Sequence, residues 1–61
     1  MNRIIITTPN GETRFLNVVS FKYVPESNSP RGFFYITFLE YQEIKKTQFE
    51  VFENNFTLEV M

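Results

Sequence analysis

The feature that most constrains this chain is that its 61 residues include neither cysteine nor histidine. A domain of this size buries only about 60% of its unfolded surface, so its hydrophobic core is small. Disulfides and zinc sites stabilise many such domains, and both depend on the missing residue types. The core must therefore consist of aliphatic and aromatic side chains. Eight Phe and three Tyr raise the aromatic content to 18%, which favours half-buried strands.

The charge balance argues against two classes of partner. Six basic and seven acidic residues give a net charge of −1, so there is no positive excess to attract nucleic acid or an acidic membrane. The N-terminus offers one Arg and the apolar run Ile4–Ile6, which is too short for a signal peptide or a membrane span. We therefore expect a protein that is cytoplasmic when synthesised and contacts no membrane.

No catalytic or metal-binding constellation is visible in the sequence. Aspartate is absent as well as cysteine and histidine, so the Ser-His-Asp, Cys-His and common metal sites cannot be assembled from this chain. The seven glutamates are dispersed, whereas a two-carboxylate site needs two that face each other in a cleft. The sequence predicts a protein that is not an enzyme, with no catalytic residues, no cofactor and no metal site.

The first half of the chain has the pattern of strands and turns. The β-branched run Ile4–Thr8 predicts a strand, and Asn10-Gly11 tolerates the positive φ of a tight hairpin turn. From Thr13 to Val24 the chain is extended and apolar on both faces. One face would carry Phe15, Val19, Phe21 and Tyr23. Such a strand is either covered by a second layer or bends at a bulge, here near Asn17.

The middle of the chain predicts a loop followed by a central strand. Residues 25–32 contain two prolines, a glycine and small polar residues, which is typical of a loop. Residues 33–41 then alternate as a strand with two apolar faces. The first face carries Phe34, Ile36 and Phe38, and the second carries Phe33, Tyr35, Leu39 and Tyr41.

Residues 42–55 fit two structures equally well. In a strand, Phe49 and Val51 share one face and Phe52 lies on the other. In a helix, the same three residues fall within one arc together with Ile44, and Asn55 could end the helix in the left-handed conformation. After this stretch, residues 56–60 alternate apolar and polar positions and predict a last strand with one exposed face.

The sharpest local motif is the segment from Arg31 to Phe38. It resembles the RNP1 motif of RNA-recognition domains, in which exposed aromatic side chains on a central strand stack on unpaired bases. In that interpretation Phe33 and Tyr35 would stack on bases and Arg31 would contact a phosphate. Phe34, however, stands where the motif has a small residue, and no companion strand motif is evident. A loop that ends in glycine and leads into an aromatic strand explains the same residues without a ligand.

The order of features along the whole chain carries a second resemblance. Its matching segments are Ile4–Ile6, Asn10-Gly11, Leu16–Phe21, Glu26 and Asn28 in the loop, Phe34–Phe38, Phe49 with Phe52, and Phe56–Val60. Together they resemble the N-terminal domain of prophage tail proteins, the tail-associated endopeptidase or baseplate-hub family of phages of Gram-positive bacteria. The loop departs from the pattern, because Ser29–Arg31 separates Asn28 from Gly32 where the family tends to have adjacent Asn-Gly.

The resemblance implies a fold and a place in an assembly. The domain would form part of a barrel in a trimeric hub at the tail tip of the virion, in contact with other tail proteins or with itself. It also implies a short helix at about residues 43–54. We therefore expect one α+β domain over residues 1–61, mainly β, built as a small antiparallel sheet or incomplete barrel with that helix. An all-β five-stranded barrel is the alternative, and the domain fits both a complete small protein and the N-terminal part of a longer one.

The expected function is a structural or assembly module of a phage or prophage tail that acts through protein–protein contacts. Two alternatives stay open. One is a small barrel that binds single-stranded nucleic acid through Arg31, Phe33 and Tyr35. The other is a small phage regulatory or inhibitory protein.

Overall fold

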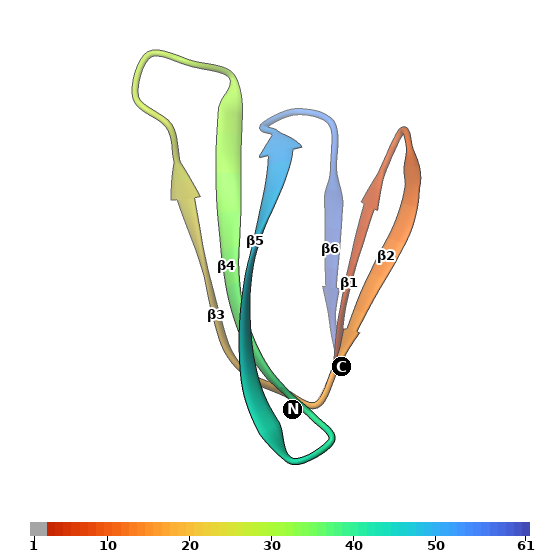
Figure 1. The fold of residues 1–61 in the computed structure, drawn as a ribbon. Helices are drawn as coiled ribbons and strands as arrows, with labels where there is room; N and C mark the ends of the chain where they lie inside the picture. The colour runs from red at the N-terminus through yellow and green to blue at the C-terminus, as the bar shows by residue number, and fades with distance from the viewer. Residues whose placement is uncertain (1–2) are drawn as a thin grey trace.

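The computed structural model describes residues 3–61, which form two antiparallel sheets of three strands each (Figure 1). The strands are β1 (Arg3–Thr8), β2 (Gly11–Leu16), β3 (Val18–Pro25), β4 (Arg31–Glu40), β5 (Glu43–Phe52) and β6 (Thr57–Val60). In the first sheet β1 lies between β2 and β6, and in the second β4 lies between β3 and β5. The prediction of a mainly β fold with a central strand after the 25–32 loop is confirmed.

A sharp bend at Asn17 carries the chain from the first sheet into the second. Asn17 has a φ of 55°, a left-handed conformation that asparagine adopts more readily than most residues. The main-chain N–H of Leu39 donates to the Asn17 carbonyl at 3.0 Å and fixes the corner against β4. The bend that the sequence placed near Asn17 is therefore confirmed.

A β-bulge beside this corner changes which of the two residues Val18 and Val19 faces the core. The register of β3 against β4 shifts between Val18 and Ser20, so the extra residue changes which side chains face inward. Val18 is buried in the core and Val19 is 55% exposed. The prediction that Val19 shares a face with Phe21 and Tyr23 is wrong, because those two pack against the core and a strict alternation cannot include the extra residue.

The core lies between the two sheets and is mainly aliphatic, with partly buried aromatic rings packed against it. Its buried residues are Ile4, Ile6, Val18, Phe34, Ile36 and Val51. Phe15 of the first sheet packs on Phe38 and Phe49 of the second, with ring centroids 6.0 and 6.1 Å apart. Fully burying a large apolar side chain contributes about 1.5–3 kcal/mol. The buried residues, together with these partly buried rings, therefore hold the two sheets together.

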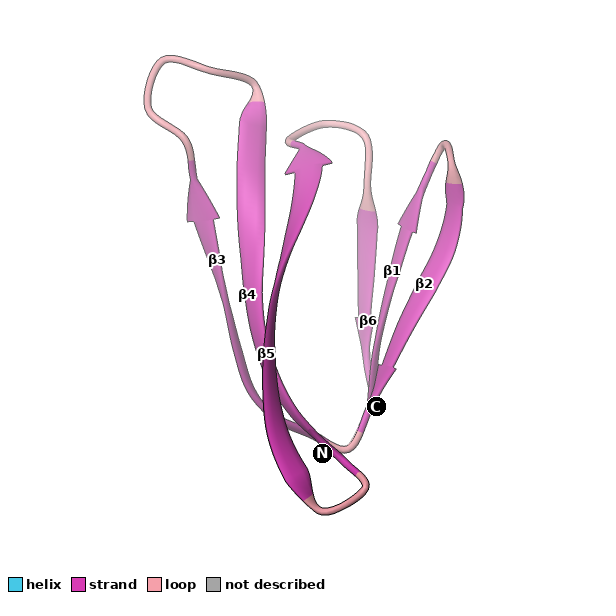
Figure 2. Ribbon diagram, viewed as in Figure 1, coloured by secondary structure: helices cyan, strands magenta, loops and turns pink. Residues whose placement is uncertain are grey.

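The expected helix at residues 43–54 is absent, and this prediction is wrong. Residues 43–52 form β5, which pairs with β4 along its whole length, and Figure 2 shows no helix in the described part of the chain. Phe49 lies opposite Phe34 and Val51 opposite Gly32, so both face the core. The ladder to β4 and the burial of these two side chains outweigh a weak local helix preference. Residues 3–61 accordingly include no helix that is long and apolar enough to cross a membrane.

The five-stranded barrel is not found either. Within the described residues the bent segment from Gly11 to Pro25 contributes a strand to each sheet, and the two sheets do not close on each other. The closing strand is short: β6 has four residues, and all of them are exposed. The architecture is a small open sandwich with β2, β3, β5 and β6 as edge strands.

Candidate functional site

The three residues of the nucleic-acid hypothesis lie on the outer face of β4. Phe34 and Ile36 are buried in the core, so the alternation of a strand turns Arg31, Phe33 and Tyr35 outward. Tyr35 is 41% exposed and Phe33 is half-buried. The structure therefore brings these three residues onto one face, as the motif requires.

Tyr35 has a polar neighbour on each side in the sheet. Lys22 of β3 and Gln48 of β5 lie opposite it in the two ladders. The Lys22 Nζ atom is 5.8 Å from the centre of the Tyr35 ring, and the Gln48 side chain donates a hydrogen bond to the Tyr35 hydroxyl at 3.4 Å. A cation and an amide beside an exposed ring are groups that can contact a nucleotide. In this structure, however, Lys22 and Gln48 already interact with the Tyr35 ring and hydroxyl.

Arg31 is engaged by two carboxylates. Its guanidinium lies 3.1 Å from Glu26 and 3.0 Å from Glu50. The pKa of Glu26 is lowered, first by a hydrogen bond with the Ser29 side chain and then by the charge of Arg31. Desolvation of Glu26 acts in the opposite direction. The charge of Glu26 in turn raises the pKa of Arg31. Because its positive charge is already compensated on both sides, Arg31 is a poor phosphate contact.

Packing explains why glycine stands at position 32 of the RNP1-like motif. The Tyr23 ring lies directly over it, and a Cβ atom at this position would overlap the phenol. The Tyr23 hydroxyl is buried without a hydrogen-bond partner among the described residues. Packing against Tyr23 thus accounts for the glycine, and burial in the core accounts for Phe34.

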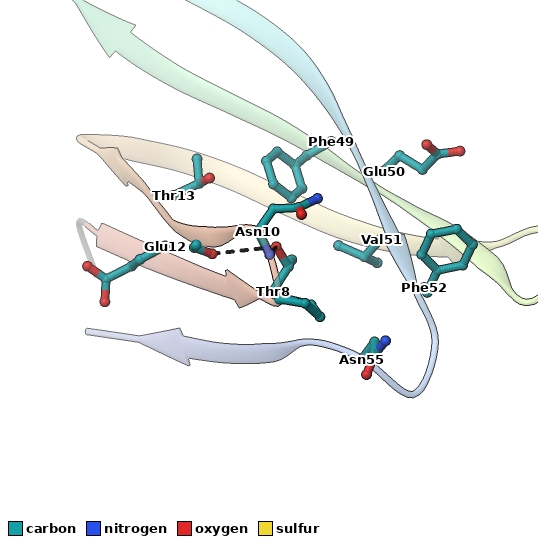
Figure 3. Close-up of a pocket in the computed structure, with 11 residues that line it drawn as sticks. Thr8, Asn10, Glu12, Thr13, Phe49, Glu50, Val51, Phe52 and Asn55 are labelled. Carbon is teal, nitrogen blue, oxygen red and sulfur yellow. Dashed lines mark hydrogen bonds between the residues drawn. The ribbon is translucent and has the colours of Figure 1, made fainter.

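A first open groove of about 490 Å³ lies between the β1–β2 turn and β5 (Figure 3). Pro9 and Asn10 make this turn, and Gly11 with a φ of 127° is the residue there that takes a positive φ. The Thr8 hydroxyl accepts a hydrogen bond from the Asn10 N–H at 3.1 Å. Phe49 and Val51 face the turn. The lining contains no nucleophile paired with a base, and residues 3–61 hold no group of three or more potential metal ligands.

A second groove of about 670 Å³ lies at the opposite end of the sandwich, at the Asn17 corner. Its lining residues are Arg14, Phe15, Leu16, Asn17, Phe38, Leu39, Glu40 and Tyr41. Most of these side chains are apolar, and Arg14 and Glu40 carry opposite charges. The Arg14 side chain remains 58% exposed although it pairs with Glu12 at 2.9 Å.

The β4–β5 turn beside this groove breaks several local rules. Figure 1 shows it projecting beyond the ends of β1, β2 and β6. Tyr41 and Gln42 both have a positive φ, 51° and 64°, which a two-residue hairpin turn normally assigns to Asn or Gly. Glu40 and Glu43 lie opposite each other, and like charges so placed are destabilising; only Glu43 has a compensating partner, Lys45 at 3.4 Å, among residues 3–61.

Apolar side chains surround this turn and are uncovered. Tyr41 is 92% exposed and Ile44 is 66% exposed. Leu39, which lies opposite Ile44, and Leu16 at the end of β2 are exposed as well. We call Leu16, Leu39, Tyr41 and Ile44 the tip cluster. The sequence analysis placed Leu39 and Tyr41 on one strand face but missed the cluster. A helix at 43–54 was expected there, so no hairpin turn was predicted at residues 41–42.

Comparison with models of known protein families, with curated proteins and with solved structures finds no match for this chain.

Proposed function

We propose that this chain is a structural or assembly module that acts through protein–protein contacts, in a phage or prophage tail. The observation that carries the proposal is the tip cluster, a group of large apolar side chains left in solvent at a projecting turn. Exposed apolar groups that gather in one place mark contact surfaces more often than single exposed residues do.

The edge of the first sheet adds support for protein contacts. Leu58 and Val60 of β6 lie opposite Ile6 and Ile4 in the ladder and share their face, yet both are exposed. β6 also has one free edge, whose main-chain groups can pair with a strand of another chain. A partner at this edge would cover the side of the sandwich that β6 leaves open.

The assignment to a tail rests on the resemblance of the sequence. Six of its seven segments fall on β1, the first turn, β2–β3, the loop between β3 and β4, β4 and β6. The remaining segment, with Phe49 and Phe52, lies on a strand in place of the implied helix. The assignment to a tail therefore depends on the sequence resemblance alone, whereas the role in protein contacts also rests on the exposed apolar surfaces.

The test of the tail assignment is the composition of the assembled particle. Tails purified from cells that produce the phage should contain the chain in a fixed ratio to the other tail proteins, as measured by quantitative mass spectrometry. A chain recovered free of particles would contradict the tail assignment. Recovery of that free chain in complex with a host enzyme would favour an inhibitory protein.

A second candidate function is binding of single-stranded nucleic acid by the outer face of β4. The observation in its favour is that Phe33 and Tyr35 share that face with Lys22 and Lys46, which flank Tyr35 and Thr37. The ion pairs of Arg31 with Glu26 and Glu50 count against it. Titration with a labelled single-stranded oligonucleotide at low salt tests it.

Tyr35→Ala separates the two functions. If the face binds nucleic acid, this substitution should remove about 1–3 kcal/mol of binding free energy per stacked base. If the outer face of β4 binds no nucleic acid, the oligonucleotide should not bind the wild type. Tyr35→Ala should then only lower the free energy of unfolding, by about 1 kcal/mol, because the ring is partly exposed. The Tyr35→Phe variant is the matched control, since it retains the ring.

A further inference from the structure

We infer that two copies of this chain associate about a twofold axis through the tip cluster and the adjoining groove. This inference deepens the proposed function and rests on it, because it names a partner for one of the exposed surfaces. The occupant of the groove would be the Tyr41 side chain of the second copy, and the reverse contact would be made at the same time.

The first step in the argument is that projection and groove are neighbours on one surface. Tyr41 is almost fully exposed at the turn, and it also borders a groove lined by Phe15, Leu16 and Phe38. An interface with a twofold axis uses the same patch on both subunits, so it needs a projection and a matching depression side by side. The tip of the β4–β5 hairpin has both.

The second step is the charge on the groove. Arg14 and Glu40 both line it. Arg14 pairs with Glu12 of its own strand at 2.9 Å and stays 58% exposed, whereas Glu40 forms no ion pair among residues 3–61. A twofold axis between the copies would place Arg14 of one copy near Glu40 of the other, twice per dimer. Complementary charges at the rim of an apolar contact fix its register and disfavour other partners.

The third step is the energetic state of the turn. Two non-glycine residues at positive φ and two opposed glutamates make this turn unfavourable in an isolated chain. Such strain persists when the surroundings compensate for it, and an interface that buries Tyr41 and neutralises Glu40 would do so. The same turn built from Asn-Gly would avoid the strain but would lack the aromatic side chain.

The experiment measures the association of the whole 61-residue chain by sedimentation velocity, at concentrations up to about 1 mM to cover weak complexes. Wild type should form a concentration-dependent dimer. Tyr41→Ala should weaken the dimer by at least about tenfold, the loss expected of a central aromatic contact. Phe52→Ala, an exposed aromatic at the other end of β5, is the matched control and should leave the dimer unchanged.

A charge exchange distinguishes the proposed axis from any other contact. Arg14→Glu places two pairs of glutamates across the interface, and Glu40→Arg places two pairs of arginines there, so each variant alone should be monomeric. An equimolar mixture of the two should form a heterodimer, because each chain then meets the opposite charge at both positions. Recovery in the mixture also shows that both variants are folded.

A wild-type chain that stays monomeric throughout, or a Tyr41→Ala variant that dimerises like wild type, would overturn the inference. A mixture of the two charge variants that stays monomeric, or a charge variant that still forms a homodimer, would overturn the proposed axis. A monomeric chain that is nevertheless found in purified tails would leave the proposed function standing, so the two failures are distinguishable.

Discussion

At one end of the β4–β5 ladder Arg31 meets two carboxylates and Gly32 lies beneath the Tyr23 ring; at the other end two glutamates face each other across a strained turn. At the first end Arg31 and Gly32 are each explained by neighbours within the chain, and the exception is the Tyr23 hydroxyl, which is buried without a hydrogen-bond partner among residues 3–61. The main-chain N–H of Glu53 even extends the pairing by donating to the Pro30 carbonyl at 2.8 Å. At the second end Glu43 pairs with Lys45 at 3.4 Å, but Glu40 has no ion pair among residues 3–61. Large apolar side chains are exposed to solvent there.

The difference indicates which end serves the fold and which end serves a partner. Proteins in which local preference, charge and packing agree fold to one structure, and departures from that agreement tend to lie at functional sites. The end at Gly32 satisfies most of its local rules, so we expect substitution of Gly32 to destabilise the fold. The end at Tyr41 departs from them, so we expect substitutions there to stabilise the fold and to reduce association.

The largest effect is expected from Gly32→Ala. The new Cβ atom would overlap the Tyr23 phenol, and overpacking of this kind costs about 3 kcal/mol. A domain of 61 residues has roughly 3–9 kcal/mol of stability in total, so much of it would be lost. Urea denaturation followed by circular dichroism measures the change.

A second substitution tests the cause of that loss. Tyr23→Phe removes the hydroxyl that lies nearest the new Cβ atom. This hydroxyl is buried without a hydrogen-bond partner among residues 3–61, so its removal alone should be neutral or slightly stabilising. In the Gly32→Ala background it should restore part of the stability. If the changes in unfolding free energy of the two single variants simply add in the double variant, the Tyr23 hydroxyl is not the group that requires glycine at position 32.

A smaller effect of opposite sign is expected at the far end. Replacing Tyr41-Gln42 by Asn-Gly gives the turn residues that accept positive φ without strain. Stability should rise by about 1–2 kcal/mol, and little burial is lost because Tyr41 is almost fully exposed. A higher urea midpoint at low protein concentration, where the chain is monomeric, is the expected result. An unchanged or lower midpoint would mean that this turn is not strained.

The smallest effect concerns acid stability at the Arg31 end. The pKa of Glu26 is lowered in the folded chain, first by the Ser29 hydrogen bond and then by the charge of Arg31. A carboxylate with a lowered pKa contributes stability above its unfolded pKa and loses that contribution as the pH falls through the folded one. From about pH 5 to about pH 3, wild type should therefore lose more stability than Glu26→Gln. Parallel curves for the two proteins would show that this ion pair contributes nothing.

Much of the fold can be predicted from the sequence where burial is regular. β1, the loop before Arg31, both faces of β4 and the last strand follow from alternation and turn residues. Val18 and Val19 could not be assigned, because a bulge shifts the alternation by one residue. β5 could not be distinguished from a helix, because its first half lies in the projecting hairpin, where Ile44 is exposed and no second layer imposes alternation.

The candidate site was predictable only in part and for the same reason. Alternation correctly placed Phe33 and Tyr35 together on one strand face, and the structure shows that this is the outer face. The two ion pairs of Arg31 were not predictable, since Glu50 becomes its neighbour only through the register of β5. The tip cluster was missed because Tyr41-Gln42 has none of the residue types that announce a tight turn.

The most direct test of this account is sedimentation velocity on the Tyr41-Gln42→Asn-Gly variant, at concentrations where wild type is dimeric. We predict a monomer at every concentration, although the variant is more stable than wild type. A variant that dimerises as wild type does would contradict the claim that the projecting turn of β4–β5 is the contact surface.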